Sequence, residues 1–319
     1  MLFSCAAGAS VLEDIYYTGE TPGAAALGRG GAYSAVKGDA YASFWNPAGL
    51  AALSENLLAV SSDFMSSGPL NKSIMAGPLS GSNLNYIAIA GPEVGMYWRP
   101  LALRVEDSTG TRNGESYRIK RDVKINMFGL SVGVKHAERV DFGMNMNFIF
   151  GTMGVAEITE QSASAEVPYG YGWGIDWGLI YRMSDQVNAG VVLRNGPSAI
   201  YWDKGFGRDR LPPILRAGLD IRLSQLMSVG VDYEKSFADS SVNPGESVHL
   251  GVEHYLAQNL ILRAGVYGSN LDSETSRVYT AGLGYMFDKY NIDLAARQAA
   301  PEGDGGTVRR YTLSGIIPF

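Results

Sequence analysis

The stretch that decides the fold is Tyr171-Gly172-Trp173-Gly174-Ile175-Asp176-Trp177-Gly178-Leu179-Ile180-Tyr181-Arg182. Its odd positions are all aromatic or aliphatic, whereas its even positions are mostly glycine or charged. Successive side chains of a β-strand point to opposite faces, so this segment has one apolar face and one small, polar face. A helical period of 3.6 residues would not separate the two classes in this way. The stretch therefore predicts a strand with two different faces.

The same alternation recurs on both sides of this stretch and predicts fourteen strands. In 116–134 the alternation changes phase, because Val123, Ile125 and Met127 precede Phe128 and Leu130. A β-bulge within this segment would account for the change. The predicted strands are 56–64, 82–90, 94–105, 116–134, 139–152, 171–183, 186–195, 213–223, 226–234, 246–256, 259–268, 276–287, 290–298 and 309–319.

Long and short connections alternate between these strands. The long ones are 65–81, 106–115, 153–170, 196–212, 235–245, 269–275 and 299–308, and the short ones have two to four residues. Transmembrane β-barrels have short periplasmic turns and longer extracellular loops. The pattern predicts an all-β fold, a 14-stranded antiparallel transmembrane barrel in the bacterial outer membrane. An even number of strands, with the short turns after the even-numbered strands, places both termini in the periplasm.

Composition excludes several other classes of protein. No run of eighteen apolar residues is present, which argues against a helical membrane span. A net charge of −6 argues against a nucleic-acid partner. The single cysteine, Cys5, excludes a disulfide framework or a multi-cysteine metal site within one chain. Residues 1–10 resemble the end of a secretory signal, and Cys5 is either a lipid-attachment site or a stray thiol.

The two faces of the strands have different expected surroundings. Arg216, Asp220, Asp232 and Arg263 lie on the glycine-bearing faces, which predicts that they line the lumen and form ion pairs there. Aromatic residues at the ends of the apolar faces are typical of interfacial girdles. Membrane lipids are therefore the expected partners of the apolar faces.

The C-terminal strand has an additional pattern. Tyr311, Leu313, Ile317 and Phe319 occupy alternate positions up to the last residue. This arrangement resembles the insertion signal that the outer-membrane barrel assembly machinery recognises. The alternative is a final strand that ends on phenylalanine by chance.

The N-terminal residues 1–55 do not alternate like strands. Gly23–Val36 is small and glycine-rich, and Asp39 is a candidate N-cap for a short helix that would end before Pro47. Residues 50–53 are expected to form another helical turn. The segment is too apolar to extend into the periplasm, and a fourteen-stranded lumen is wide enough to contain it. We therefore expect two parts, a plug at 1–55 and a barrel at 56–319.

This N-terminal part resembles the signature of the FadL/PorV superfamily of outer-membrane proteins. The resemblance rests on 27–33, on Asp39 and on Phe44-Trp45-Asn46-Pro47-Ala48-Gly49-Leu50, with further likeness at 211–213, 249–255 and 262–265. It implies a 14-stranded barrel with an N-terminal hatch. The compact length is similar to the PorV/PorQ branch. The plug-motif residues are Gly28, Gly30, Gly31, Asp39, Asn46, Pro47, Ala48 and Gly49.

Two functions follow from the resemblance. Transporters of the superfamily pass hydrophobic small molecules through an opening in the barrel wall at a kinked third strand, and here Trp98 and Pro100 are the candidates for it. The alternative for Pro100 is a position outside the hydrocarbon zone. Four residues of the loop 198–210 either capture an apolar ligand or only pack over the barrel mouth: Ile200, Tyr201, Trp202 and Phe206.

The second function is that of a scaffold which handles cargo for a type IX-like secretion system, as in the PorV branch, with secretion-system proteins as partners. Short loops favour the scaffold, and Pro100 favours transport. We expect no enzymatic activity and no cofactor or metal, because the three histidines are scattered and no phosphate loop, nucleophile elbow or zinc motif is present.

Overall fold

The computed structural model describes residues 21–65, 84–112, 115–237, 245–273, 276–299 and 308–319. The candidate signal at 1–10, Cys5 and most of the predicted connection 65–81 lie outside the described residues. In the described part of the chain, no helix is long and apolar enough to cross a membrane.

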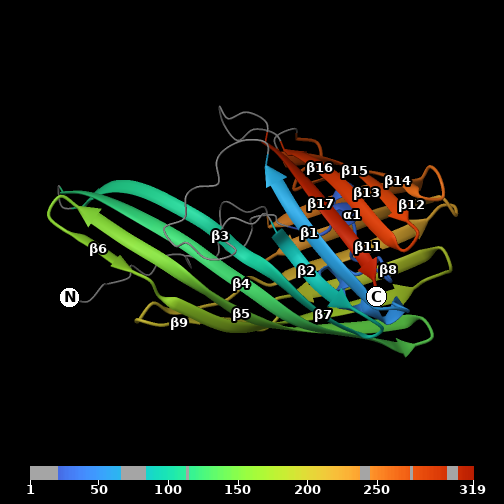
Figure 1. Ribbon diagram of the computed structural model, residues 1–319, viewed down its shortest axis with the longest axis horizontal. Coiled ribbons are helices and arrows are strands. Elements are labelled where there is room, and N and C mark those ends of the chain that lie inside the picture. The colour runs from blue at the N-terminus through green and yellow to red at the C-terminus, as the bar shows by residue number, and fades with distance from the viewer. Residues whose placement is uncertain (1–20, 66–83, 113–114, 238–244, 274–275, 300–307) are drawn as a thin grey trace.

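The strands form one closed antiparallel ring (Figure 1). Fourteen strands make up the wall: β1 (Leu57–Met65), β2 (Leu84–Ala90), β3 (Val94–Arg112), β4 (Glu115–Ala137), β5 (Val140–Thr159), β7 (Tyr169–Arg182), β8 (Val187–Arg194), β11 (Ile214–Arg222), β12 (Met227–Ser236), β13 (Glu246–Tyr255), β14 (Leu260–Gly268), β15 (Arg277–Phe287), β16 (Tyr290–Ala299) and β17 (Val308–Pro318). β1 pairs with both β2 and β17, which closes the ring. Three short strands are added to it: β6 (Ala163–Glu166), β9 (Ser198–Trp202) and β10 (Gly207–Asp209).

The predicted fold class and all fourteen predicted strands are confirmed. Three predicted loops are wrong. The segment 106–115 is mostly strand, because β3 and β4 stay paired as far as Arg112 and Glu115. The segment 153–170 contains the end of β5 and the strand β6. The segment 196–212 contains the hairpin of β9 and β10, which pairs with β7. β3, β4 and β5 project beyond the rest of the wall (Figure 1), and in this projection the described part of β3 is paired with β4.

The bulge predicted in the fourth strand is also misplaced. The pairing of β4 with β5 runs without a shift from Tyr117 to Lys135. The register shift lies in β3, between Pro100 and Ala102, with Leu101 as the extra residue. The phase change in the sequence of β4 therefore has another cause: its inner face changes from apolar to small and polar along one regular strand.

The apolar faces of the strands point outward. Trp173 and Trp177 are each 39% exposed, whereas Asp232 and Arg216 are 1% and 2% exposed. A water-soluble barrel would bury the apolar face and expose the charges. The observed orientation is that of a barrel whose outer surface contacts lipid.

The N-terminal segment is short-helical and is enclosed by the ring. It contains α1 (Ala24–Gly28), α2 (Ala42–Trp45) and the 3-10 helix η1 (Pro47–Ala52). The first helix contacts β14 to β17, and η1 contacts β4, β5 and β7. The predicted end of a helix before Pro47 agrees with α2. The residues of all three helices are almost entirely buried.

Candidate ligand-binding site

Part of the inner wall is apolar. Val123, Ile125 and Met127 of β4 and Ile149 and Met153 of β5 point inward and are at most 5% exposed. Further along β4, towards the short turns, the inward positions are small or polar, such as the serine and glycine at 131 and 133. The lumen is therefore apolar on the side of the long connections and polar on the side of the short turns.

Strands β2 and β3 add aromatic side chains to the same region. Tyr86 and Tyr97 are stacked, with ring centroids 5.6 Å apart, and both are buried. The hydroxyl of Tyr97 donates to Oδ1 of Asn147 at 2.7 Å. The bulged residue Leu101 is 8% exposed. A tyrosine whose hydroxyl is satisfied by the wall presents mainly its ring to the lumen.

The hairpin of β9 and β10 completes this surface. Ile200 and Trp202 are buried, and the indole of Trp202 donates to Asp209 at 2.9 Å. Tyr201 points the other way and stacks on Tyr171 with a centroid distance of 5.9 Å. The four residues predicted for a capture loop are thus divided: Ile200 and Trp202 face inward, while Tyr201 and Phe206 are exposed.

We call these inward residues the apolar lumen cluster. Its members belong to one continuous hydrophobic core: Tyr86, Tyr97, Leu101, Val123, Ile125, Met127, Ile149, Met153, Ile200, Trp202 and Leu211.

Aromatic residues of the N-terminal segment share the core of the apolar lumen cluster, and the ring of Tyr41 lies 5.3 Å from that of Tyr86. Phe44 and Trp45 belong to the same core and pack edge to face, with centroids 5.2 Å apart. The guanidinium groups of Arg99 and Arg194 lie 4.7 and 4.2 Å from the centroid of the Phe44 ring. That of Arg216 lies 5.0 Å from the Trp45 ring. Cation–π contacts at these distances are attractive, so α2 is held to β3, β8 and β11.

Asn46 ties the segment to the wall. Its amide nitrogen donates to the carbonyl of Ser34 at 2.7 Å and to that of Leu179 at 3.2 Å, and its oxygen accepts from the Ala48 amide at 3.1 Å. A Cβ atom at Gly178 would collide with the Asn46 oxygen and with the Pro47 ring. The glycine on the inner face of β7 is what permits this approach.

The remaining plug-motif residues are also tightly enclosed. Gly30 and Gly31 have φ values of 65° and 76°, which favour glycine, and the Gly30 amide donates to Thr280 at 3.0 Å. A Cβ at Gly28 would lie 3.0 Å from Cα of Gly282, and one at Gly49 would lie 3.0 Å from the Val36 carbonyl. Gly28 and Gly30 allow the segment to pack directly on the backbone of the wall, and Gly49 allows two parts of the segment to pack on each other.

Asp39 does not cap a helix as predicted. The α2 helix begins at Ala42 with Tyr41 as its N-cap. The Asp39 carboxylate instead accepts from the Tyr33 hydroxyl at 2.5 Å and from the Tyr41 amide at 2.6 Å. Burial raises the pKa of the Asp39 carboxyl, although these two donors oppose the shift. Burial also raises the pKa of Tyr33 well above its usual value, which keeps its hydroxyl a donor.

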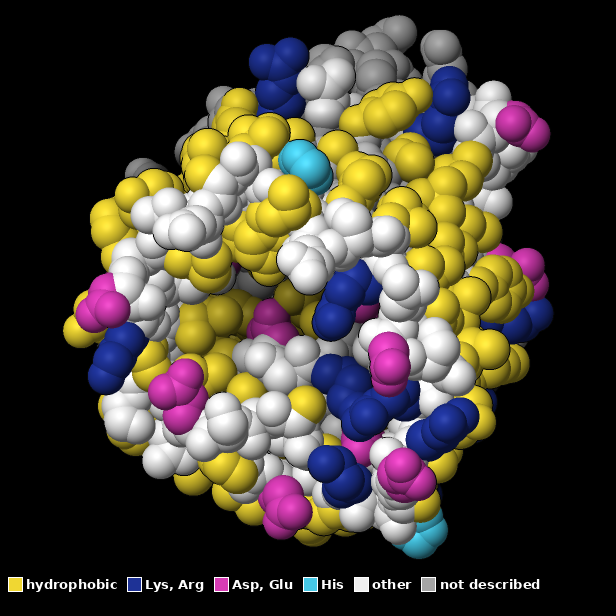
Figure 2. Space-filling view, turned by 90° about the vertical axis from the view of Figure 1, so that its right-hand side faces the viewer, with side chains coloured by type: hydrophobic (Ala, Val, Ile, Leu, Met, Phe, Trp, Pro, Cys, Tyr) yellow, Lys and Arg dark blue, Asp and Glu magenta, His cyan; other side chains and the backbone are white. Residues whose placement is uncertain are grey.

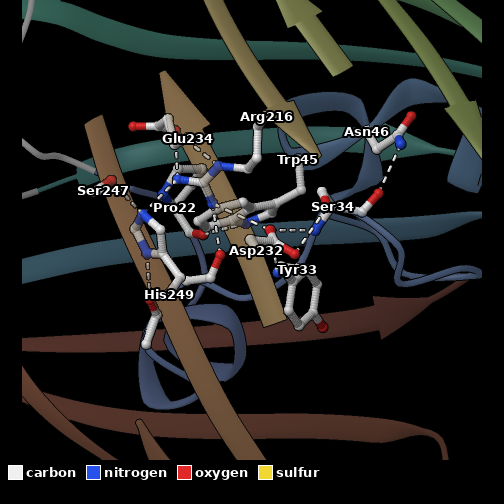
Figure 3. A network of polar contacts seen from close by, with 12 residues as sticks. Pro22, Tyr33, Ser34, Trp45, Asn46, Arg216, Asp232, Glu234, Ser247 and His249 are labelled. Atoms are coloured by element: carbon white, nitrogen blue, oxygen red, sulfur yellow. Dashed lines mark hydrogen bonds and ion pairs between the residues drawn. The ribbon is translucent and has the colours of Figure 1, made fainter. Parts of the chain in front are cut away.

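A network of charged groups surrounds the turn after α1 (Figure 3). Arg216 donates to Glu234 at 2.8 Å and to the Gly31 carbonyl at 2.6 Å. Asp232 accepts from the amides of Tyr33 and Ser34. His249, from β13, places Nδ1 2.7 Å from the carbonyl of Gly30. Strands β11 to β13 therefore bind the same turn of the N-terminal segment.

The other two predicted lumen charges also lie on the inner face. Asp220 pairs with Arg29 of the segment at 2.6 Å. Arg263 pairs with Glu253 at 2.6 Å and with Asp293 at 2.5 Å, so it links neighbouring strands. Figure 2 views the end with the short turns: the face is hollowed near its centre, charged side chains gather around the hollow, and hydrophobic side chains follow the outer edge.

The two candidate residues for a lateral opening lie where the pairing of β3 changes. Within the described residues, β2 pairs with β3 only from Ala90–Gly95 to Ile87–Trp98. Pro100 follows two residues later, is buried, and pairs only with Asn126 of β4. Trp98 is half-buried.

The residues of the predicted insertion signal are exposed on the outside of β17 or at its end. They are Tyr311, Leu313, Ile317 and Phe319. The amide of Phe319 donates to the Asn56 carbonyl at 3.0 Å, which holds the C-terminus beside the start of β1.

Sequence reasoning missed the apolar lumen cluster itself. The phase change at Val123, Ile125 and Met127 was a usable signal, because three apolar residues on the glycine-bearing face of a strand must point into the lumen. Asp176, which accepts from Asn145 at 3.0 Å and from Asn147 at 2.9 Å, was also missed. In the described part of the chain, no group of three metal-ligating side chains comes together.

Comparison with solved structures assigns the fold to a class. The chain resembles the monoaromatic hydrocarbon channel CymD with a TM-score of 0.65 and 15% identity, covering 93% of this chain and 97% of that one. It resembles the toluene transporter TbuX of Ralstonia pickettii with a TM-score of 0.63 and 13% identity, over 93% and 98%. For a Pseudomonas aeruginosa FadL homologue the TM-score is 0.60 at 13% identity, over 94% and 99%. No family model and no curated sequence matches.

The chain therefore has the fold of the FadL-like β-barrels. At these sequence identities the comparisons establish the fold alone. The ligand has to be inferred from the residues of the site.

Proposed function

We propose that this protein is an outer-membrane channel that takes up small hydrophobic molecules. The observation that supports it best is the apolar lumen cluster, eleven inward side chains in a barrel whose other inward positions are largely glycine, polar or charged. A barrel that conducted only water-soluble solutes would gain nothing from apolar lining. Solved barrels of the same fold are described as channels for monoaromatic hydrocarbons and toluene, which supports the same class of ligand.

The orientation follows from the same features. The exposed apolar faces place the wall in lipid, and the short turns lie at the end where the C-terminus is found (Figure 1). In outer-membrane barrels the short turns are periplasmic, so the long connections and the apolar side of the lumen face outward. A molecule from outside would reach the apolar lumen cluster before the charged network around the N-terminal segment.

That segment acts as a plug. Its helices are buried, and Ala24, Ser43 and Tyr33 are hydrogen-bonded to β17, β5 and β12, which lie on different sides of the ring. An apolar molecule would have to displace ion pairs and polar side chains to continue straight into the periplasm. Desolvating such groups is costly, so exit through the wall is the easier route.

The lateral exit lies between β2 and β3, beside Pro100. Within the described residues the β2–β3 ladder stops at Ile87–Trp98, and Pro100 has no N–H with which to extend it, so the two strands have no backbone pair beside Pro100. Tyr86, Tyr97 and Leu101 of the apolar lumen cluster line the inner side of this position. A bound apolar molecule would pass from these side chains into the hydrocarbon of the membrane.

A disulfide across the last rung of the β2–β3 ladder tests this exit. Ile87 and Trp98 are direct partners, so the double variant Ile87→Cys/Trp98→Cys, in a Cys5→Ser background, joins the two strands when oxidised. We expect cells that express it to take up radiolabelled toluene severalfold more slowly when oxidised than after reduction. The reduced protein is the matched control for folding.

Uptake that does not exceed that of cells without the barrel would refute the channel. Equal uptake by the oxidised and reduced proteins would refute only this exit.

One observation favours a second function, a scaffold of the PorV/PorQ type that handles secretion cargo. The packing of the segment against Gly133, Gly143 and Gly178 is so close that a Cβ at any of them would collide with Pro47 or its neighbours. A tightly filled lumen suits a protein that does not conduct. Isolating the barrel from cells with mild detergent and finding secretion proteins bound, without toluene uptake, would favour this function.

A further inference from the structure

The wall has a second interruption, far from Pro100 in sequence. The ladder between β8 and β11 ends at the pair Arg194–Ile214, and the ladder between β9 and β10 begins at Ile200–Asp209. Between these pairs, within the described chain, no backbone hydrogen bond joins residues 195–199 to 210–213. On the other side, the backbone of 196 and 197 is hydrogen-bonded to Ile175 of β7.

The composition of this interruption explains why no ladder forms. Pro197, Pro212 and Pro213 lie on its two sides and have no N–H groups. Asn195 adopts a left-handed conformation with a φ of 52°, which turns the chain out of the strand geometry. The three prolines and Asn195 cannot continue a regular strand pair, so the sequence itself accounts for the interruption.

Side chains hold the two edges together in place of the backbone. The Ser198 hydroxyl donates to the Leu211 carbonyl at 3.2 Å and accepts from the Leu211 amide at 3.0 Å. The Asn195 side-chain amide donates to the Pro212 carbonyl at 3.1 Å. Three side-chain hydrogen bonds, all from two residues, are easier to open than a backbone ladder that is fixed along its length.

Both sides of this seal are apolar. On the inside, Leu211, Ile200 and Trp202 belong to the apolar lumen cluster. On the outside, Leu193 of β8 and Leu215 of β11 are direct partners next to the end of the ladder, on the same lipid-facing side as Trp177 of β7, which is 39% exposed. An apolar molecule that crosses here would leave the apolar lumen cluster and enter membrane lipid.

We propose that this interruption is a second lateral passage for apolar ligands, closed by Ser198 and Asn195. This proposal rests on the proposed uptake function and adds a second route for the ligand. The passage opens when the Ser198 and Asn195 hydrogen bonds separate, and it connects the apolar lumen cluster with membrane lipid at the junction of β8, β9, β10 and β11. No covalent step is involved.

A disulfide can lock this seal. Continuing the β9–β10 register from Ile200–Asp209 places Ser198 opposite Leu211, in agreement with their two hydrogen bonds. In the Cys5→Ser background, we expect oxidised Ser198→Cys/Leu211→Cys to take up radiolabelled toluene at most at about half the rate of the same protein after reduction. Migration of unheated samples on gels confirms that both forms are folded barrels.

The Ile87→Cys/Trp98→Cys lock, measured beside it, separates the two routes. Loss of uptake on oxidation of the 198/211 pair, reversed by reductant, supports the second passage. Unchanged uptake with a complete 198/211 disulfide overturns it, and loss with the 87/98 lock alone then leaves the proposed function intact. If the parent barrel takes up no toluene, the proposed function fails and the second passage fails with it.

A single substitution provides an independent measurement. Ser198→Ala removes two of the three hydrogen bonds without adding bulk, so we expect uptake to rise about twofold. The exposed Ser184→Ala in a short turn is the matched control. A rate for Ser198→Ala equal to that of the control would contradict the role of Ser198 as the seal.

Discussion

Asp232 binds Ser34 through both of its carboxylate oxygens. The amide of Ser34 donates to Oδ2 and its hydroxyl donates to Oδ1, each at 2.9 Å. Asp232 is on β12, inside the wall, and Ser34 is on the N-terminal segment, 198 residues away in sequence. One buried carboxylate therefore fixes the position of the segment relative to the barrel.

Removing this carboxylate should release the segment. Asp232→Ala loses three hydrogen bonds to a charged acceptor, which should cost about 3 kcal/mol or more of stability. It also leaves Arg216 with one fewer acidic neighbour. We expect larger and more frequent conductance steps in planar bilayers than for the parent protein. Asp185→Ala, in a short turn, is the control, and identical conductance of all three proteins would contradict the prediction.

Two glycines of one strand should respond differently to the same change. Gly178 and Gly174 both lie on the inner face of β7, but a Cβ at 178 would collide with Asn46, whereas one at 174 would be 3.5 Å from its nearest neighbour. We expect Gly178→Ala to cost about 1–3 kcal/mol through overpacking and Gly174→Ala to be nearly neutral. Thermal unfolding in detergent measures the stability of both variants. Equal losses of stability would show that the close contact between Gly178 and Asn46 does not restrict the size of the side chain at 178.

The wall was predictable from the sequence because every strand is governed by the same local rule. Alternation over Tyr171–Arg182 specifies which face meets lipid, and it does so without knowledge of the neighbouring strands. The extension of β3 to Arg112 was not predictable in this way, since its residues are polar on both faces and are held by pairing with β4. Long-range pairing overrides composition at such places.

The site was less predictable than the wall. The glycines and Asn46 of the N-terminal motif were identifiable as a unit, but their partners, such as Thr280 and Leu179, lie far away in sequence. The hairpin of β9 and β10 has the composition of a loop, and it became strand because β7 offers a free edge to it. The inward residues of different strands form one apolar region only when the register of every strand in the ring is known.

The outer face of β7 should not tolerate a charge. Leu179 is 41% exposed and lies between Trp177 and Tyr181 on the lipid-facing side. Leu179→Arg should cost about 2–4 kcal/mol near the middle of the membrane and reduce the yield of folded barrel. Gln186→Arg, in the short turn, should have little effect. Urea unfolding in lipid vesicles measures the difference, and equal stability would place this face outside the hydrocarbon.

The stability of the barrel should depend on the ionisation of Asp39. Because burial raises the pKa of its carboxyl in the folded state, the folded protein keeps a proton that the unfolded chain has already lost. The free energy of unfolding should therefore fall as pH rises from the ordinary aspartate pKa through the raised one, and this contribution should be constant outside that window. Asp39→Asn should remove this fall. Unfolding of both proteins measured from pH 3 upward tests it, and parallel curves would show that Asp39 does not titrate abnormally.

The apolar lumen cluster should be sensitive to the introduction of a polar group. Ile125 is 1% exposed on the inner face of β4, so Ile125→Asn buries an amide without a partner and should cost about 1–3 kcal/mol. The same amide lowers the affinity of the lining for an apolar ligand, and we expect toluene uptake to fall severalfold. Phe128→Leu, on the opposite face of the same strand, should leave uptake unchanged and controls for effects on the wall. If Ile125→Asn loses stability but keeps full uptake, the ligand does not contact this part of the lumen, and the apolar lumen cluster serves packing alone.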